Sequence, residues 1–234
     1  MAQHLDLEEQ EQLDQVKHFW KQYGDLITWV LIAVLGSYAA WNGYQYWQRN
    51  QASKASILFE EVERAAQSKD LTKLERAYGD IQSGYSSTAY AQRAGLLAAK
   101  GFYDGNQPDK AKAALTWVAE KSGDEGYVAI AKLRLAGLLA DAKAYDDALK
   151  LLGGSFPKEY EALVADRKGD VLALQGKPDE AKNQYAAAYA AFGANATNAA
   201  DYRKLVEFKL NALGVDVAKD DKPAALESTT DAKK

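Results

Sequence analysis

The stretch GDVLALQGKPDEA, residues 169–181, has the features of two short helices joined by a tight turn. Gly169 is small enough to let two helices cross closely, and Gly176 can adopt the backbone conformation that a tight turn needs. Pro178 suits the first turn of a second helix, where the two acidic residues that follow it complement the positive end of the helix dipole. The stretch therefore predicts a helical hairpin with its turn at Gly176.

The second helix of this hairpin carries a stripe of Ala181, Tyr185 and Ala188, spaced to face the first helix. The small anchor residue Ala181 has upstream counterparts in Ala111 and Ala148, and the three anchors are 37 and then 33 residues apart. A repeat of about 34 residues built from two helices is the tetratricopeptide pattern. The stretch around Ala181 matches this pattern closely, and the two upstream copies match it less well.

From Asn50 onward, apolar residues recur with a helical period, and no convincing alternating strand pattern is present. The sequence therefore predicts an all-α protein: one transmembrane helix followed by a tetratricopeptide-like solenoid of α-hairpins. Residues 51–83 are expected to form an additional hairpin, residues 155–158 a linker turn and residues 199–213 a closing helix. The predicted helices cover residues 51–68, 71–83, 88–104, 108–120, 126–142, 145–152, 159–175, 178–192 and 199–213.

A stretch without charged residues runs from Leu26 to Gln48, between Asp25 and Arg49. A helix from Leu26 to Trp47 would be roughly 33 Å long, enough to cross the hydrocarbon layer of a bilayer. Aromatic residues cluster at both ends of the stretch, as is typical of helices that end at the two membrane interfaces. No helix breaker lies between Trp47 and Ala55, so the first helix of the repeat region can continue directly from this segment.

Two alternatives stay open for this segment: a cleaved signal peptide ending near Ser37-Tyr38-Ala39, and a buried helix of a soluble core. The long acidic stretch before it disfavours a signal peptide, and its length disfavours a core helix. Lysine and arginine are balanced on its two sides, so charge does not assign the orientation. The predicted organisation is an N-terminal arm (1–25), a transmembrane helix (26–47), a helical repeat domain (48–215) and a disordered tail (216–234).

The composition excludes several kinds of chemistry. The chain has 0 Cys, so it has no disulfide and no thiolate nucleophile or metal ligand. Its 2 His, His4 and His18, precede the apolar segment, so the repeat region has no imidazole for a metal site or a general base. The net charge of −4 argues against nucleic acid as a partner. We predict no cofactor, no metal and no enzymatic activity, with catalysis by carboxylates alone as the remaining alternative.

Stacked helical hairpins form a concave surface along their first helices, and such a surface suits the binding of a protein or peptide. The simpler interpretation of polar residues on it is a set of solvated charges, with packing as the role of a tyrosine. The residues that the pattern places on this groove are Arg93, Lys100, Tyr103, Asp141, Asp166 and Asp170.

Four stretches in this order resemble the ancillary SecYEG translocon subunit family (YfgM) of Gram-negative bacteria. They are VKHFWKQYG (residues 16–24), GYQYW (43–47), VADRKGD (164–170) and VEFKLNAL (206–213). The resemblance extends to about residue 214, and the polar tail beyond it departs from the family pattern.

The resemblance implies an inner-membrane protein with a cytoplasmic N-terminal arm and a periplasmic repeat domain. It also implies association with the SecYEG translocon and with the periplasmic folding factor PpiD, and a role in helping exported polypeptides pass to periplasmic chaperones. The family has no catalytic residues to transfer to this chain. A tetratricopeptide scaffold for another envelope assembly complex is the alternative.

Overall fold

A computed structural model describes residues 7–192 and 200–215 of the chain, and every regular element in these ranges is a helix. The all-α prediction is therefore confirmed for the described part of the chain. The elements are α1 (Leu7–Gln67), α2 (Leu71–Tyr85), α3 (Ala89–Asp104), α4 (Pro108–Lys121), α5 (Glu125–Asp141), α6 (Tyr145–Leu152), the 3₁₀ turn η1 (Lys158–Tyr160), α7 (Glu161–Leu174), α8 (Pro178–Phe192) and α9 (Ala200–Ala212). The predicted disordered tail, residues 216–234, lies outside the described residues.

The predicted helices of the repeat region are all present, with one difference in form. The helix expected from residue 159 begins as the 3₁₀ turn η1, because the Tyr160 amide donates to the Pro157 carbonyl at 2.9 Å before the α-helical bonds of α7 begin. The first predicted helix has no start of its own and continues from the apolar segment within α1, as the lack of a breaker after Trp47 indicated.

The chain divides into two compact units, Met1–Lys54 and Ala55–Lys234. In the first unit, α1 is the one helix of the described residues that is long and apolar enough to cross a membrane, and only 6% of its most apolar window is buried. Apolar side chains such as Trp29 (71% exposed) and Leu35 (64% exposed) face outward. This exposure argues against the buried core helix, and a transmembrane anchor at residues 26–47 stays the prediction that we favour.

Polar side chains inside the apolar stretch bond to the helix itself. The Thr28 hydroxyl donates to the Gly24 carbonyl at 2.8 Å, and the Ser37 hydroxyl donates to the Ala33 carbonyl at 2.7 Å. Such bonds satisfy the hydroxyl groups without water, which lowers the cost of placing them in lipid.

In the described part of the second unit, four hairpins have turns of the same geometry. Lys69, Asn106, Lys143 and Gly176 have positive φ values of 55°, 57°, 61° and 80°, and each lies two residues before a second helix begins. In every turn the amide of the next residue donates to a carbonyl five residues back: Asp70 to Ala65, Gln107 to Phe102, Ala144 to Leu139 and Lys177 to Leu172. The hairpins are therefore the C-terminal part of α1 with α2, α3 with α4, α5 with α6, and α7 with α8. Residues 51–83 form the additional hairpin that the sequence predicts.

Small residues lie where the paired helices cross. The anchors Ala111, Ala148 and Ala181 are each 0% exposed. A Cβ atom on Gly169 would fall 2.5 Å from the Cδ1 atom of Tyr185, so only glycine fits this crossing of α7 and α8 without a shift of the ring. The crossing predicted at Gly169 is therefore confirmed.

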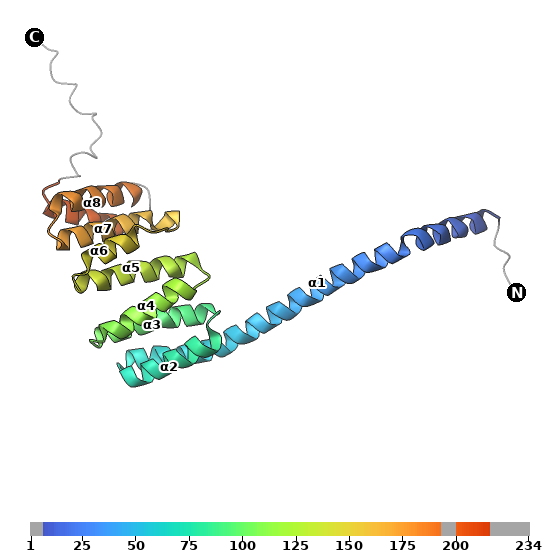
Figure 1. Cartoon of the computed structure of the whole chain (residues 1–234), viewed down its shortest axis with the longest axis horizontal. Coiled ribbons are helices and arrows are strands. Elements are labelled where there is room, and N and C mark those ends of the chain that lie inside the picture. Colours follow the sequence, from blue (N-terminus) through green and yellow to red (C-terminus); the bar gives the residue numbers. More distant parts are fainter. Residues whose placement is uncertain (1–6, 193–199, 216–234) are drawn as a thin grey trace, which may run out of the picture. The chain divides into compact units, whose positions relative to one another are not determined.

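The hairpins are stacked as successive layers (Figure 1). They bury apolar residues against one another. One core joins the end of α1 with α2, α3, α4 and part of α5, a second joins α5, α6 and α7, and a third joins α7, α8 and α9. Helix α9 covers the last layer with Val206 and Leu210, both 0% exposed, as expected of a closing helix.

Candidate functional site

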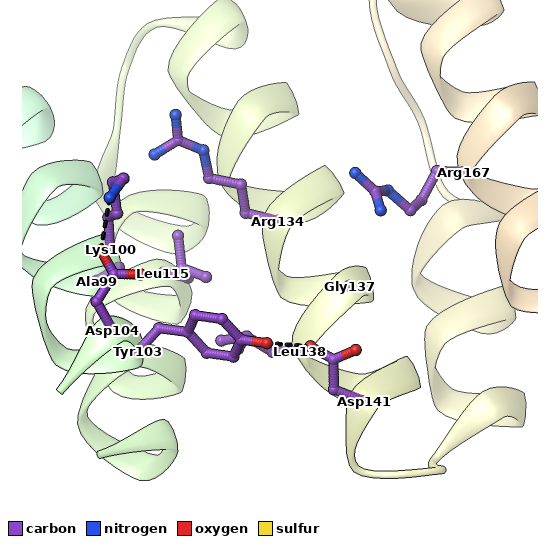
Figure 2. Close-up of a pocket in the computed structure, with 10 residues that line it drawn as sticks. All are labelled: Ala99, Lys100, Tyr103, Asp104, Leu115, Arg134, Gly137, Leu138, Asp141 and Arg167. Atoms are coloured by element: carbon purple, nitrogen blue, oxygen red, sulfur yellow. Dashed lines mark hydrogen bonds and ion pairs between the residues drawn. The ribbon is translucent and has the colours of Figure 1, made fainter. Parts of the chain in front are cut away.

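A cavity of about 410 Å³ opens on the first helices of three hairpins (Figure 2). Helices α3, α5 and α7 supply most of its wall, and Leu115 of α4 contributes to its floor. The lining residues are Ala99, Lys100, Tyr103, Asp104, Leu115, Arg134, Gly137, Leu138, Asp141 and Arg167. Three residues predicted for the groove, Lys100, Tyr103 and Asp141, therefore lie together in one cavity.

Tyr103 and Asp141 join two hairpins across this cavity. The Tyr103 hydroxyl on α3 donates to an Asp141 carboxylate oxygen on α5 at 2.7 Å. This hydrogen bond, reinforced by the negative charge of Asp141, raises the pKa of Tyr103 above its ordinary value. The phenol therefore stays protonated at neutral pH and keeps its bond to the carboxylate.

Lys100 forms a local pair on α3. Its ammonium lies 2.5 Å from a carboxylate oxygen of Asp104, one helical turn away, and both side chains are largely exposed. The charges of Lys100 and Asp104 therefore largely balance one another at the edge of the cavity.

Two arginines from successive hairpins also face the cavity, Arg134 on α5 and Arg167 on α7. Each lies nine residues before the positive-φ residue of its hairpin, Lys143 or Gly176. An Nη1 atom of Arg134 donates to the Leu96 carbonyl at 3.1 Å. Arg167 lies 3.6 Å from an Asp170 carboxylate oxygen, a long and partly exposed contact.

Asp166 and Asp170 lie in a polar cluster between α7 and α9. The ammonium of Lys209 on α9 is 2.7 Å from Asp166 and 2.6 Å from Asp170, and the Tyr202 hydroxyl donates to Asp166 at 3.1 Å. Asp166 is only 1% exposed, so it does not present a charge to an open groove. The cluster links the closing helix to the last hairpin, and binding of a partner by these two residues stays a prediction.

Tyrosines next to this cluster are held in their neutral form. Burial, followed by the negative charge of Asp166, raises the pKa of Tyr202 to about 12. Burial also raises the pKa of Tyr185, whose hydroxyl donates to Asp170 at 3.0 Å. Both phenols therefore act as hydrogen-bond donors, Tyr202 to the buried Asp166 and Tyr185 to the partly exposed Asp170.

Arg93 lies apart from the cavity. Its guanidinium stacks 4.7 Å from the ring centre of Phe59 on α1 and 5.9 Å from that of Tyr90 on α3. This packing gives Arg93 a structural role between two first helices, while its part in partner binding stays a prediction.

The cavity offers guanidinium, ammonium, phenol and carboxylate groups above an apolar floor. In the ranges that the structure describes, no group of three or more His, Cys, Asp or Glu side chains could hold a metal ion. The chemistry of the lining is that of reversible hydrogen bonding and apolar contact, which suits the binding of a polypeptide segment.

The sequence matches the family described as "Tetratricopeptide repeat-like domain" over residues 17–215. It is also 32% identical to the ancillary SecYEG translocon subunit of Neisseria gonorrhoeae, over 91% of this chain and 100% of that protein. The chain belongs to the ancillary SecYEG translocon subunit family. Proteins of the same name from Haemophilus influenzae (28% identity, 76% of this chain, 87% of the relative) and Escherichia coli (25% identity, 88% and 97%) are also similar.

Family membership confirms the resemblance carried by the ordered stretches between residues 16 and 213. The predicted groove set did not include Arg134 and Arg167, although a usable signal was present. The two arginines are 33 residues apart, the same spacing as the anchors Ala148 and Ala181. A search for charges that recur with the repeat would have found them.

Proposed function

We propose that this member of the ancillary SecYEG translocon subunit family is a membrane-anchored scaffold without catalytic activity. It associates with the SecYEG translocon and binds segments of exported polypeptides in the groove on α3, α5 and α7. In this role it helps these polypeptides pass to periplasmic chaperones. The observation that carries the proposal is the cavity shared by three successive first helices, because its wall offers contacts for a polypeptide.

Association with SecYEG is supported by the shared name of three relatives, each covering most of this chain. The apolar stretch of α1 supports a single-pass inner-membrane protein, which would hold the groove close to the translocon. Tethering raises the effective concentration of the groove near membrane-bound partners, so weak contacts with each passing segment are sufficient.

The proposed orientation places the N-terminus in the cytoplasm and the repeat domain in the periplasm. Protease added to spheroplasts should therefore digest the repeat domain, and a tag at the N-terminus should be protected until the membrane is opened. A repeat domain that resists external protease in intact spheroplasts, with a digested N-terminal tag, would reverse the assignment.

Crosslinking in intact cells tests the partners. A photoreactive residue at Tyr103 or Leu138 in the cavity should capture SecYEG, the folding factor PpiD and nascent secretory polypeptides. The same residue at Lys112, an exposed position on α4 that does not line the cavity, is the matched control. Capture of only a different envelope assembly complex from the cavity positions would favour the alternative scaffold and contradict the proposal.

A further inference from the structure

We infer that the groove selects segments carrying an acidic side chain beside apolar residues, with Arg134 and Arg167 as the pair that binds the carboxylate. This inference rests on the proposed function, because it specifies which polypeptide segments the groove takes. The supporting observation is a repeated position. In two successive hairpins, the residue nine positions before the turn is an arginine whose guanidinium faces the same cavity.

The other charges of the cavity already have partners within it. Lys100 is paired with Asp104 at 2.5 Å, and Asp141 accepts a hydrogen bond from Tyr103 at 2.7 Å. These pairs leave the two arginines as the source of positive charge for a ligand.

Neither arginine is occupied by a close carboxylate. Among the described residues Arg134 forms no ion pair, and its one hydrogen bond goes to the uncharged carbonyl of Leu96. Arg167 lies 3.6 Å from Asp170, whose other carboxylate oxygen already accepts from Lys209 at 2.6 Å and from Tyr185 at 3.0 Å. A guanidinium has five N–H donors in a fork that fits a carboxylate, so both side chains retain donors for a ligand.

Glycine at position 137 leaves the cavity wall open beside Arg167. Gly137 lies on α5 one turn after Arg134, and a Cβ built on it would lie 3.8 Å from an Nη1 atom of Arg167. The lining is mainly apolar below the charges, with Leu138 partly buried and Leu115 only 2% exposed. An apolar side chain of the ligand can contact this floor while a neighbouring carboxylate reaches the arginines.

Arg167 is the one residue of α7 in the cavity wall, which continues from it over α5 to α3, so a bound chain can run from the arginines along these two helices. Because the proposed ligands are segments of passing polypeptides, we assign the carboxylate to an aspartate or glutamate side chain within a segment and not to a chain terminus. A lysine at the same place of the segment would meet two guanidinium groups and be repelled.

Binding of short labelled peptides to the full chain in nanodiscs tests the inference by fluorescence anisotropy. The probes are acetylated and amidated peptides in which leucine alternates with glutamate, glutamine or lysine, and a glutamine peptide with a free C-terminal carboxylate. We expect the glutamate peptide to bind about tenfold more tightly than its amidated glutamine counterpart, since hydrogen bonds to charged groups are the stronger ones. Raising the salt concentration should reduce this preference.

Three variants assign the effect to the arginines. Arg134→Gln and Arg167→Gln should each remove most of the preference for the glutamate peptide. Gly137→Leu should weaken the binding of all the peptides, because it fills the groove without changing its charge. Arg76→Gln, on the exposed face of α2 outside the cavity, is the matched control and should leave binding unchanged. Arg134→Lys keeps the charge and loses the fork, so an intermediate preference is expected.

The outcomes separate this inference from the proposed function. One outcome would overturn the inference and leave polypeptide binding by the groove in place. In it, the glutamate and glutamine peptides bind equally well, Gly137→Leu abolishes this binding, and Arg134→Gln leaves it unchanged. Preference only for the free C-terminal carboxylate would overturn the assignment to an internal side chain. No binding of any peptide, together with no capture of polypeptides from Tyr103 or Leu138 in cells, would overturn both.

Discussion

The ring of Tyr185 lies directly over Gly169, at a distance that leaves no space for a methyl group. A Cβ at position 169 would fall 2.5 Å from the Cδ1 and Cε1 atoms of the ring, and the ring cannot turn away easily because its hydroxyl is bonded to Asp170. We expect Gly169→Ala to destabilise the repeat unit by about 1–3 kcal/mol, the usual cost of overpacking a core. Urea unfolding of the full chain in nanodiscs, followed by circular dichroism, measures the change.

Gly137→Ala is the control for this prediction. It makes the same substitution in a neighbouring first helix, where the new Cβ would be in ordinary contact with Arg167 at 3.8 Å. Because alanine is the better helix former, we expect a gain of about 0.5–1 kcal/mol. Equal losses at both positions would show that close packing against Tyr185 is not the cause.

The shared turn of the hairpins predicts opposite effects at two equivalent positions. Lys143 and Gly176 both have positive φ, but only glycine adopts this conformation without steric cost. Lys143→Gly should therefore stabilise the repeat unit by about 0.5–1 kcal/mol, and Gly176→Ala should destabilise it by about 1 kcal/mol. The same urea unfolding measures both, and a loss of stability in Lys143→Gly would contradict this account of the turn.

These turns also explain how far the sequence predicts the fold. Helical periodicity and the Gly–Lys–Pro turn at residues 176–178 identify the last hairpin with no further information. The other three turns place Lys69, Asn106 and Lys143 at the same position. Asparagine tolerates positive φ, but lysine gives no comparable turn signal. The upstream repeats therefore look degenerate in sequence although their backbones share one geometry.

The candidate site was predictable only in part, for a related reason. Periodicity places Lys100, Tyr103 and Asp141 on the first helices, and they do meet in one cavity. It also places Asp166 on such a helix, but cannot show that α9 packs over it and supplies Lys209 from 43 residues further along the chain. A single helix does not specify what covers its outer face, so burial of a charge there depends on tertiary contacts.

Removal of Asp166 should loosen the closing helix. Asp166→Ala takes away a buried acceptor of two bonds, from Lys209 at 2.7 Å and from Tyr202 at 3.1 Å. We expect a loss of about 2 kcal/mol, because the Tyr202 hydroxyl loses its acceptor and Lys209 keeps only Asp170. Amide hydrogen exchange should become faster in α9 before it changes in α3 or α4.

Glu75→Ala is the matched control. Glu75 also pairs with a lysine of another helix, Lys110 at 2.6 Å, but both of these side chains are exposed. The loss there should stay below about 1 kcal/mol, and equal losses for the two pairs would contradict the role given to burial.

Alkaline pH should weaken the same region in a way that depends on Tyr202. Burial raises the pKa of Tyr202 to about 12 in the folded chain, whereas the unfolded phenol titrates near its ordinary value of 10.0. Below about pH 10 both states carry the proton, so the contribution of this tyrosine to stability is fully present. Between about pH 10 and pH 12 the unfolded state loses its proton first, and stability falls by up to about 1.4 kcal/mol per pH unit. Urea unfolding across this pH range, measured for the original chain and for Tyr202→Phe, isolates the effect. The phenylalanine variant should be less stable at pH 8, because the hydrogen bond to Asp166 is gone. Its free energy of unfolding should decline less steeply above pH 10. Parallel pH profiles for the two proteins would contradict the assignment.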